Sequence, residues 1–135
     1  MGKNAVVYWS GTGNTQVMAE MVARAAGAEL FTASEFSPEM LDRFDAVAFG
    51  CPSMGAEELE ENEFAPMFEA CKPGLNGKKL ALFGSYGWGD GEWMRNWEAD
   101  CIAAGAVLAC DSVICNEYPD DEAAMACDAL GKALI

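Results

Sequence analysis

A short polar loop follows directly on an apolar run near the start of the chain. Its residues are Ser10, Gly11, Thr12, Gly13, Asn14 and Thr15. The two glycines allow positive φ angles and bring backbone N–H groups close to an anion, and the hydroxyl and amide side chains add donors. A helix that begins here would aim its unpaired N–H groups and the positive end of its dipole at the same point. The loop is therefore predicted to hold a phosphate group.

This phosphate loop carries no cation. It lacks the Lys of a nucleoside-triphosphate loop, and no basic residue stands between Lys3 and Arg24. A phosphate bound here is held by neutral dipoles and keeps its charge. Such a site suits a small, permanently bound cofactor better than a nucleoside triphosphate with magnesium. The plainer interpretation of the same residues is a polar turn between a strand and a helix, with a Thr as the helix cap.

Two more loops combine glycine with residues that could hold a flat ring. The first contains Pro52, Ser53, Met54, Gly55, Ala56, Glu57, Glu58 and Leu59, and the second contains Ser85, Tyr86, Gly87, Trp88, Gly89, Asp90 and Gly91. Met54 offers a polarizable thioether, Glu57 an acceptor, and Gly55 a peptide that can rotate. Trp88 stands among glycines, where an aromatic ring has little to pack on unless a flat partner covers it.

Each of these residues also has a purely structural interpretation. Met54 could fill the core, Trp88 could cover the surface, and the acidic run 57–63 could be a solvated helix start. These interpretations do not explain why the loops should fall at the same edge of a sheet. The elements around the loops predict that they do.

Apolar strands alternate with amphipathic helices along the chain. Strands are predicted at 5–9, 28–33, 44–51, 79–85 and 106–115, the last interrupted by Asp111 and Ser112. Helices are predicted to end at Gly27, at Pro73 and Gly74, and at Gly105, with a short helix at 38–43 and a last helix at 121–134. This pattern predicts an α/β fold: a doubly wound, five-stranded parallel sheet with helices on both faces. Ligands of such sheets bind beyond the carboxyl ends of the strands, where all three loops would meet.

Length and charge limit the possible functions. The 135 residues, 52% of them apolar, predict one domain over 1–135 with a substantial core. The 8 Lys and Arg against 22 Asp and Glu give a formal net charge of -14. So acidic a surface repels nucleic acid and anionic membranes and favours basic protein partners. We expect a monomer that binds neither nucleic acid nor membranes.

The six cysteines, at 51, 71, 101, 110, 115 and 127, fit no CxxC, zinc or iron–sulfur spacing. We interpret them as small buried apolar residues, and we expect no metal site. The N-terminus has no signal-peptide pattern, and Val6 stands where a myristoylation motif requires Ser or Thr. These features predict a protein of the reducing cytoplasm.

The motifs YWSGTGNT, CPSMGAEELEE and GSYGWGDGEWM resemble those of short-chain flavodoxins of the clostridial and related anaerobe type. The resemblance extends from the first strand to the closing residues 116–121 and implies strand order 2-1-3-4-5 and one tightly bound, non-covalent FMN. The implied cofactor-binding residues are Ser10, Gly11, Thr12, Gly13, Asn14, Thr15, Pro52, Ser53, Met54, Gly55, Ala56, Glu57, Ser85, Tyr86, Gly87, Trp88, Gly89 and Gly91.

The resemblance also implies individual roles. Residues 10 and 12–15 would hold the phosphate, Met54 would cover the inner flavin face, and Trp88 would stack on the outer face. Glu57 would accept from the ring N3–H. The Gly55–Ala56 peptide would flip on reduction, so that its carbonyl accepts from N5–H of the neutral semiquinone. Relatives often carry a polar residue where this chain has Ala56.

The function implied is that of a low-potential one-electron carrier that uses the semiquinone/hydroquinone couple of FMN between redox enzymes. Acidic residues in or beside the three loops make the negative charge of the fully reduced flavin less favourable. One carboxylate about 10 Å from the reduced ring costs roughly 0.4 kcal/mol in water and about 1.7 kcal/mol at an effective dielectric near 20. Each therefore lowers the potential by on the order of 20 to 70 mV before salt screening.

Enzymes form the main alternative class. A flavodoxin-like NAD(P)H-dependent quinone or azo reductase needs a second substrate site and a dimer interface, for which 135 residues leave little room. The chain also has no His and no nucleophile beside a base. A receiver domain of similar topology needs acids and a Lys at the strand ends, whereas the third strand ends in Gly50, Cys51 and Pro52. We therefore expect an electron-transfer protein and not an enzyme.

Overall fold

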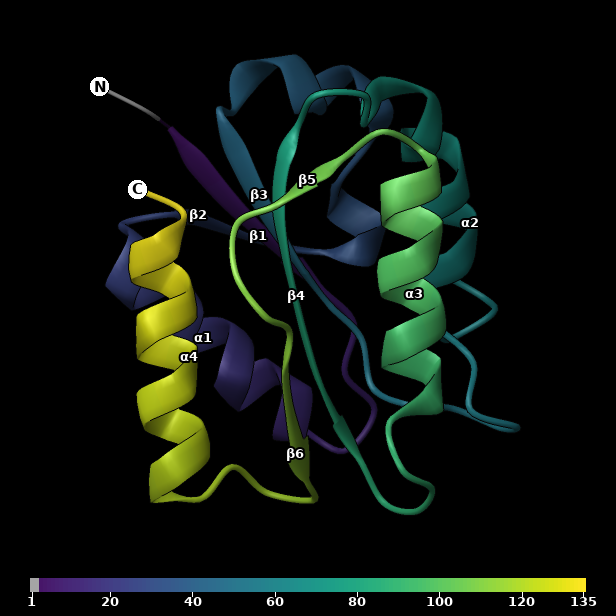
Figure 1. The fold of residues 1–135 in the computed structure, drawn as a ribbon, viewed down its shortest axis with the longest axis vertical. Helices are drawn as coiled ribbons and strands as arrows, with labels where there is room; N and C mark the ends of the chain where they lie inside the picture. The colour runs from purple at the N-terminus through teal and green to yellow at the C-terminus, as the bar shows by residue number, and fades with distance from the viewer. Residues whose placement is uncertain (1–2) are drawn as a thin grey trace.

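A parallel sheet forms the middle layer of the molecule (Figure 1). The computed structural model describes residues 3–135. The strands are β1 (Asn4–Tyr8), β2 (Glu29–Thr32), β3 (Ala46–Gly50), β4 (Lys79–Tyr86), β5 (Val107–Leu108) and β6 (Val113–Asn116). Their order is β2-β1-β3-β4-β5, every neighbouring pair is parallel, and β6 also pairs with β4. The predicted α/β class and strand order are confirmed.

The predicted fifth strand is split into β5 and β6. β5 pairs with the first residues of β4, and β6 pairs with its last residues, 83–86. Between them the Ser112 hydroxyl donates to Glu98 Oε2 at 2.6 Å, away from the sheet. Both pieces lie beside β4, so they occupy one position in the strand order. The polar pair Asp111 and Ser112 marks the break, as the sequence indicated.

The α-helices are α1 (Asn14–Ala26), α2 (Phe64–Cys71), α3 (Glu92–Ala103) and α4 (Asp121–Ala133). Gly27 ends α1 with a left-handed φ of 61°, as its position predicted. The expected short helix at 38–43 is a 3-10 helix, η2 (Pro38–Arg43). Two 3-10 turns were not predicted: η1 (Ala33–Glu35), which takes the last residue of the expected second strand, and η3 (Lys72–Gly74).

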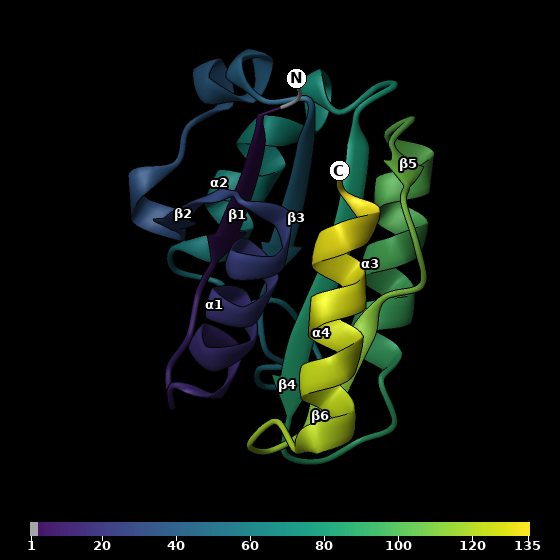
Figure 2. The same cartoon turned by 90° about the vertical axis from the view of Figure 1, so that its left-hand side faces the viewer.

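Helices cover both faces of the sheet. Helices α1 and α4 pack together on one face, and α2 and α3 lie on the other (Figures 1 and 2). Because side chains alternate along a strand, Val6 and Tyr8 of β1 face α1 and α4, whereas Ala5 and Val7 face the opposite core. That second core is aromatic: Phe49, Phe64, Phe68 and Trp97 meet mostly edge to face, with ring centroids 5.3 to 6.3 Å apart. It anchors α3 beneath the third glycine-rich loop.

The cysteines pack as small apolar side chains, as predicted. Cys51, Cys71, Cys101 and Cys127 are buried, and the other two are half-buried. Burial raises the pKa of Cys51 and of Cys127 to about 12, so these thiols stay protonated at neutral pH. Within the described residues 3–135, every helix is too short or too polar to pass through a lipid bilayer.

Candidate cofactor-binding site

The polar loop 10–13 joins β1 to α1 at the carboxyl end of the sheet. It closes on itself, because Gly13 N donates to Ser10 Oγ at 3.0 Å. Gly13 is the residue that precedes α1, with a φ of 96° that glycine adopts without strain. Within residues 3–135, no side chain caps the first turn of α1. The N–H groups at this end are therefore left as donors for an anion, and the interpretation as a Thr-capped turn is wrong.

Thr15 ties this loop to the end of β4. Its side chain is buried, its Oγ1 lies 3.0 Å from Ser85 Oγ, and it accepts from Ser85 N at 3.4 Å. The hydroxyl is thus engaged within the protein and sets the spacing between the first and third loops. The group that Thr15 can still offer to an anion is its backbone N–H in the first turn of α1.

The second loop is a closed turn. Met54 and Glu58 exchange two backbone hydrogen bonds of 2.8 Å each. Gly55 and Glu57 between them both have positive φ, 53° and 56°. For Glu57 this conformation costs on the order of 1 kcal/mol, because a side chain crowds the backbone there. Such local strain is found at functional turns more often than elsewhere.

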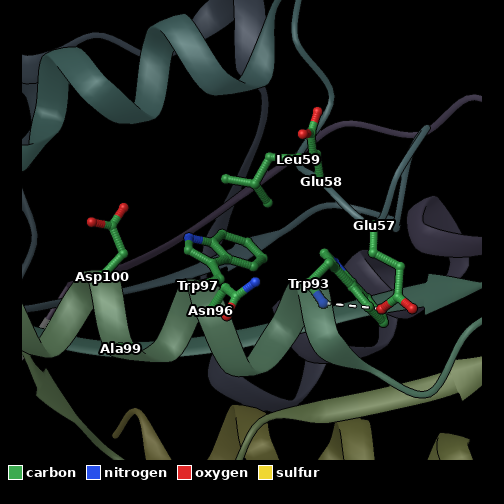
Figure 3. Close-up of a pocket in the computed structure, with 8 residues that line it drawn as sticks. All are labelled: Glu57, Glu58, Leu59, Trp93, Asn96, Trp97, Ala99 and Asp100. Atoms are coloured by element: carbon green, nitrogen blue, oxygen red, sulfur yellow. Dashed lines mark hydrogen bonds between the residues drawn. The ribbon is translucent and has the colours of Figure 1, made fainter.

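Glu57 joins the second loop to the third. Its Oε2 accepts from Trp93 N at 3.2 Å, at the start of α3 (Figure 3). A Cβ on Gly89 would overlap this carboxylate, so the glycine makes room for it. One carboxylate can accept several hydrogen bonds, so the contact with Trp93 N leaves Glu57 with further acceptor capacity.

Aromatic rings and one ion pair hold the third loop. The rings of Tyr86 and Trp93 lie 5.6 Å apart, and Trp93 Nε1 donates to Cys51 O at 3.1 Å. Arg95 pairs with Asp90 at 3.0 Å, so this exposed acid does not stand alone. Trp88 is 64% exposed. So large an apolar ring on the surface is a candidate for covering a flat ligand.

A recess of about 260 Å³ opens where the three loops meet. It brings together these predicted residues: Gly11, Thr12, Asn14, Pro52, Ser53, Met54, Ser85, Tyr86 and Gly87. Ser10, Gly13 and Thr15 shape its first wall through the contacts above. The remaining predicted residues are Gly55, Ala56, Glu57, Trp88, Gly89 and Gly91, which stand in the second and third loops but do not line the recess.

One residue of the wall, Glu117, was missing from the predicted set. Glu117 follows β6 directly, has a left-handed φ of 61°, and donates its N–H to Tyr86 O at 2.8 Å. Its Oε1 would lie 3.1 Å from a Cβ on Gly87. The rule that ligands bind beyond the strand ends could have found it, because β6 ends at Asn116 beside the end of β4.

Glu60 differs from the exposed acids on either side of it. It is only 5% exposed, and its carboxylate accepts from the N–H groups of Asn62, Glu63 and Phe64, each at 2.8 Å. Burial by itself raises the pKa of Glu60, but these three donors outweigh burial and hold the pKa below its usual range. Glu60 therefore caps the start of α2. The interpretation of the whole run 57–63 as a solvated helix start is therefore wrong for Glu60, whereas Glu58, Glu61 and Glu63 are exposed.

The fold and site define a class: a doubly wound α/β protein with an anion-binding loop at the carboxyl edge of its sheet. Comparison with known proteins narrows this class. Residues 6–129 match the flavodoxin family. The chain is 44% identical to the flavodoxin of Megasphaera elsdenii over 134 residues, 95% of each chain. It is 43% identical to the flavodoxin of Clostridium beijerinckii over 134 residues, 96% of each chain. The protein belongs to the flavodoxin family.

Solved structures of flavodoxins have the same fold as this chain. The solution structure of two-electron reduced Megasphaera elsdenii flavodoxin superposes with a TM-score of 0.89, at 40% identity and 97% coverage of both chains. An archaeal flavodoxin superposes with a TM-score of 0.84 at 25% identity, over 98% of this chain and 95% of that one. As a flavodoxin, the chain is an electron-transfer protein with FMN as its cofactor and not an enzyme. The alternative of a quinone or azo reductase is not favoured.

Proposed function

We propose that residues 1–135 form one FMN-binding domain that carries single electrons at low potential between redox enzymes of the cytoplasm. FMN, when bound, supplies the chemistry by accepting and releasing electrons one at a time. The chain's own residues bind and orient the cofactor, set the charge around it and present a surface to partners. We further propose that the carrier acts as a monomer.

The observation that carries the proposal is the uncapped start of α1 beside a hydroxyl-rich loop without a cation. A terminal phosphate matches these donors because it is an anion small enough to fit at a helix end. Thr12 and Asn14 line the recess, and the loop passes close to the Trp9 ring at Gly11, where an added Cβ would lie 3.0 Å from the ring. The residues therefore fit the phosphate end of FMN.

The second and third loops fit the flat end of the cofactor. Met54 is 37% exposed and lines the recess, and Trp88 is the exposed aromatic of the third loop, so the two are proposed to cover opposite ring faces. Glu57 keeps an acceptor for a ring N–H besides its contact with Trp93 N. The positive φ of Gly55 supports its proposed role as the peptide that reorients with redox state.

Partner choice is proposed to follow charge. The net charge is -14, and Glu58 in the second loop and Glu61 just after it are exposed. Basic surfaces of reductases and oxidoreductases would meet this edge, with no role for nucleic acid or membranes. The same carboxylates would make each added negative charge on the cofactor less favourable.

Stripping the flavin and titrating the protein with FMN, riboflavin and FAD tests the phosphate assignment. FMN is expected to bind far more tightly than riboflavin, with no preference for FAD. Thr12→Val removes one hydroxyl without changing the side-chain volume much. It should lower the affinity for FMN by about three- to tenfold and leave the affinity for riboflavin unchanged. Equal affinities for FMN and riboflavin would overturn the assignment.

A further inference from the structure

A second recess lies on the other side of the Glu57 link, between the second loop and α3 (Figure 3). Its volume is about 480 Å³, and none of its lining residues belongs to the wall of the cofactor recess. Leu59, Trp93 and Trp97 form its apolar part, and Glu57, Glu58 and Asp100 supply carboxylates. Figure 3 shows Glu58 and Asp100 on opposite sides of Leu59 and Trp97.

The Trp97 indole N–H lacks an acceptor. Trp97 is only 2% exposed, and within residues 3–135 its Nε1 is the one buried side-chain nitrogen or oxygen without a hydrogen-bond partner. The N–H groups of Trp9 and Trp93 both have acceptors, each at 3.1 Å. The Trp97 ring cannot turn freely, because it packs edge to face on Phe64 and Phe68 at 5.4 and 5.7 Å. Buried donors are normally paired, so this one points to an acceptor supplied from outside.

The charges around the recess point to a cation. Among the described residues 3–135, Glu58 takes part in no ion pair, and Asp100 pairs with Lys72 at 2.6 Å. Lys72 also reaches Glu69 at 2.7 Å, so one cation serves two acids. The surroundings of the recess therefore remain acidic and would repel an anionic ligand.

We propose that this recess receives an arginine residue of a partner protein. The arginine's main-chain carbonyl accepts from Trp97 Nε1, and its apolar stem packs against Leu59 and the indoles. The guanidinium meets Glu58 and Asp100. Arginine fits better than lysine because its five donors spread over a plane and can serve two separated carboxylates, whereas an ammonium is a point charge.

Glu57 connects the recess to the cofactor loops, because it belongs to the second loop, lines the recess and contacts the start of α3 through its carboxylate. An arginine seated here would hold the partner within reach of the cofactor edge. That the partner is an electron-transfer protein rests on the proposed function, whereas the affinity of the recess for arginine does not.

The test uses the ¹⁵N-labelled full chain as purified and a blocked arginine, N-acetyl-arginine N-methylamide. The matched control ligand is the citrulline analogue, which keeps the shape and the carbonyls but has no charge. Two-dimensional NMR separates the indole N–H signals of the four tryptophans. The arginine compound should shift the Trp97 signal saturably, and the Asn96 and Asp100 amides with it, while the Trp9 signal stays in place.

Variants assign the contacts. Trp97→Phe keeps a ring against Phe64 and Phe68 but removes the donor, and should weaken binding by about threefold or more, followed at the Asn96 and Asp100 amides. Glu58→Gln, on an exposed side chain, should weaken it by about twofold or more, and Glu20→Gln on α1 should have no effect. The proposal is overturned by an unmoved Trp97 signal, by equal binding of citrulline, or by full affinity in both Trp97→Phe and Glu58→Gln. None of these outcomes bears on FMN binding, which the flavin titration measures separately.

Discussion

Trp88 combines a large apolar ring with an exposure of 64%, on a loop that adjoins the cofactor recess. Trp88→Ala should weaken FMN binding by about 1–3 kcal/mol, because a stacked aromatic face is lost. Flavin fluorescence in the complex should rise, since the indole that quenches it is gone. A fluorescence titration measures both effects. Ile102→Ala, also at an exposed apolar side chain (61%), is the control and should change neither. Unchanged affinity and quenching in Trp88→Ala would assign that face to another ring, such as Tyr86.

Glu60 is expected to act on stability and not on the cofactor. Glu60→Gln removes the charge from three hydrogen bonds at the start of α2 and should lower the free energy of unfolding by about 1–2 kcal/mol at pH 7. Because the folded-state pKa of Glu60 is lowered, its contribution is present above the ordinary Glu pKa and is lost as the pH falls through the folded-state pKa. Urea unfolding at several pH values measures this.

The difference in stability between the parent and Glu60→Gln should therefore shrink below about pH 4.3, the ordinary Glu range. Glu61→Gln, at an exposed side chain beside it, should give a difference close to zero at every pH. A Glu60→Gln difference that stays constant down to acid pH would contradict the capping role.

At the residue scale, the candidate site could be predicted where a residue type in its sequence context serves few structural purposes. Glycine and hydroxyl residues after a strand indicate an anion loop, and Gly13 does adopt the left-handed conformation before α1. Side-chain partners were not predictable. Nothing in the order of residues 57–63 indicates that Glu57 contacts Trp93 N while Glu60 caps α2, because both contacts depend on where the chain turns. Glu117 was left out of the predicted set although it directly follows the last strand, and only its contact with Tyr86, a residue distant in sequence, was beyond prediction.

At the scale of elements, strands buried on both faces were the easiest to predict, since β1, β3 and β4 are almost continuously apolar. The observed strand boundaries differ from the predicted ones by a few residues where a side chain makes contacts outside the sheet. Trp9, for example, lies beyond the end of β1 and donates to Glu63 Oε1 at 3.1 Å. The two unpredicted 3-10 turns, η1 and η3, are three residues long each, too short to show a periodic pattern.

Gly131 allows α4 to approach α1 closely. A Cβ at this position would lie 2.6 Å from Val22 O and 2.7 Å from Ala25 Cβ, both on α1. Gly131→Ala should therefore lower the free energy of unfolding by about 1–3 kcal/mol, even though alanine favours a helix more than glycine does. Urea unfolding of the protein tests this, with Ala129→Ser at an exposed position of α4 as the control. A Gly131→Ala variant more stable than the parent would show that the two helices can separate at little cost.

At the scale of the whole molecule, the net charge of -14 is expected to affect both the redox potential of the bound flavin and the rate of encounter with partner proteins. Glu58→Gln with Glu61→Gln removes two exposed charges and leaves the caps and the Glu57 link intact. The lower of the two one-electron potentials of the bound flavin should rise by tens of millivolts, on the order of 20 mV or more per charge. Electron transfer with a basic partner should slow at low salt and converge with the parent at high salt.

Potentiometry and stopped-flow kinetics of this double variant separate the two effects. A change in rate alone would mean that the acids recognise partners but lie too deep in solvent to affect the flavin. If both the potential and the rate stay the same, the electrostatic interpretation is contradicted. A basic small protein and a neutral one of similar size, used as parallel partners, show whether the change in rate depends on the partner's charge.

The most direct test of the central claim is a visible absorption spectrum of the flavin-loaded protein during stepwise dithionite reduction, followed by a separate trial with NADPH alone. We expect two resolved one-electron steps, the second at a potential well below that of free FMN, and no rapid bleaching by NADPH without a reductase. Reduction in a single two-electron step, or rapid bleaching by NADPH alone, would contradict the claim.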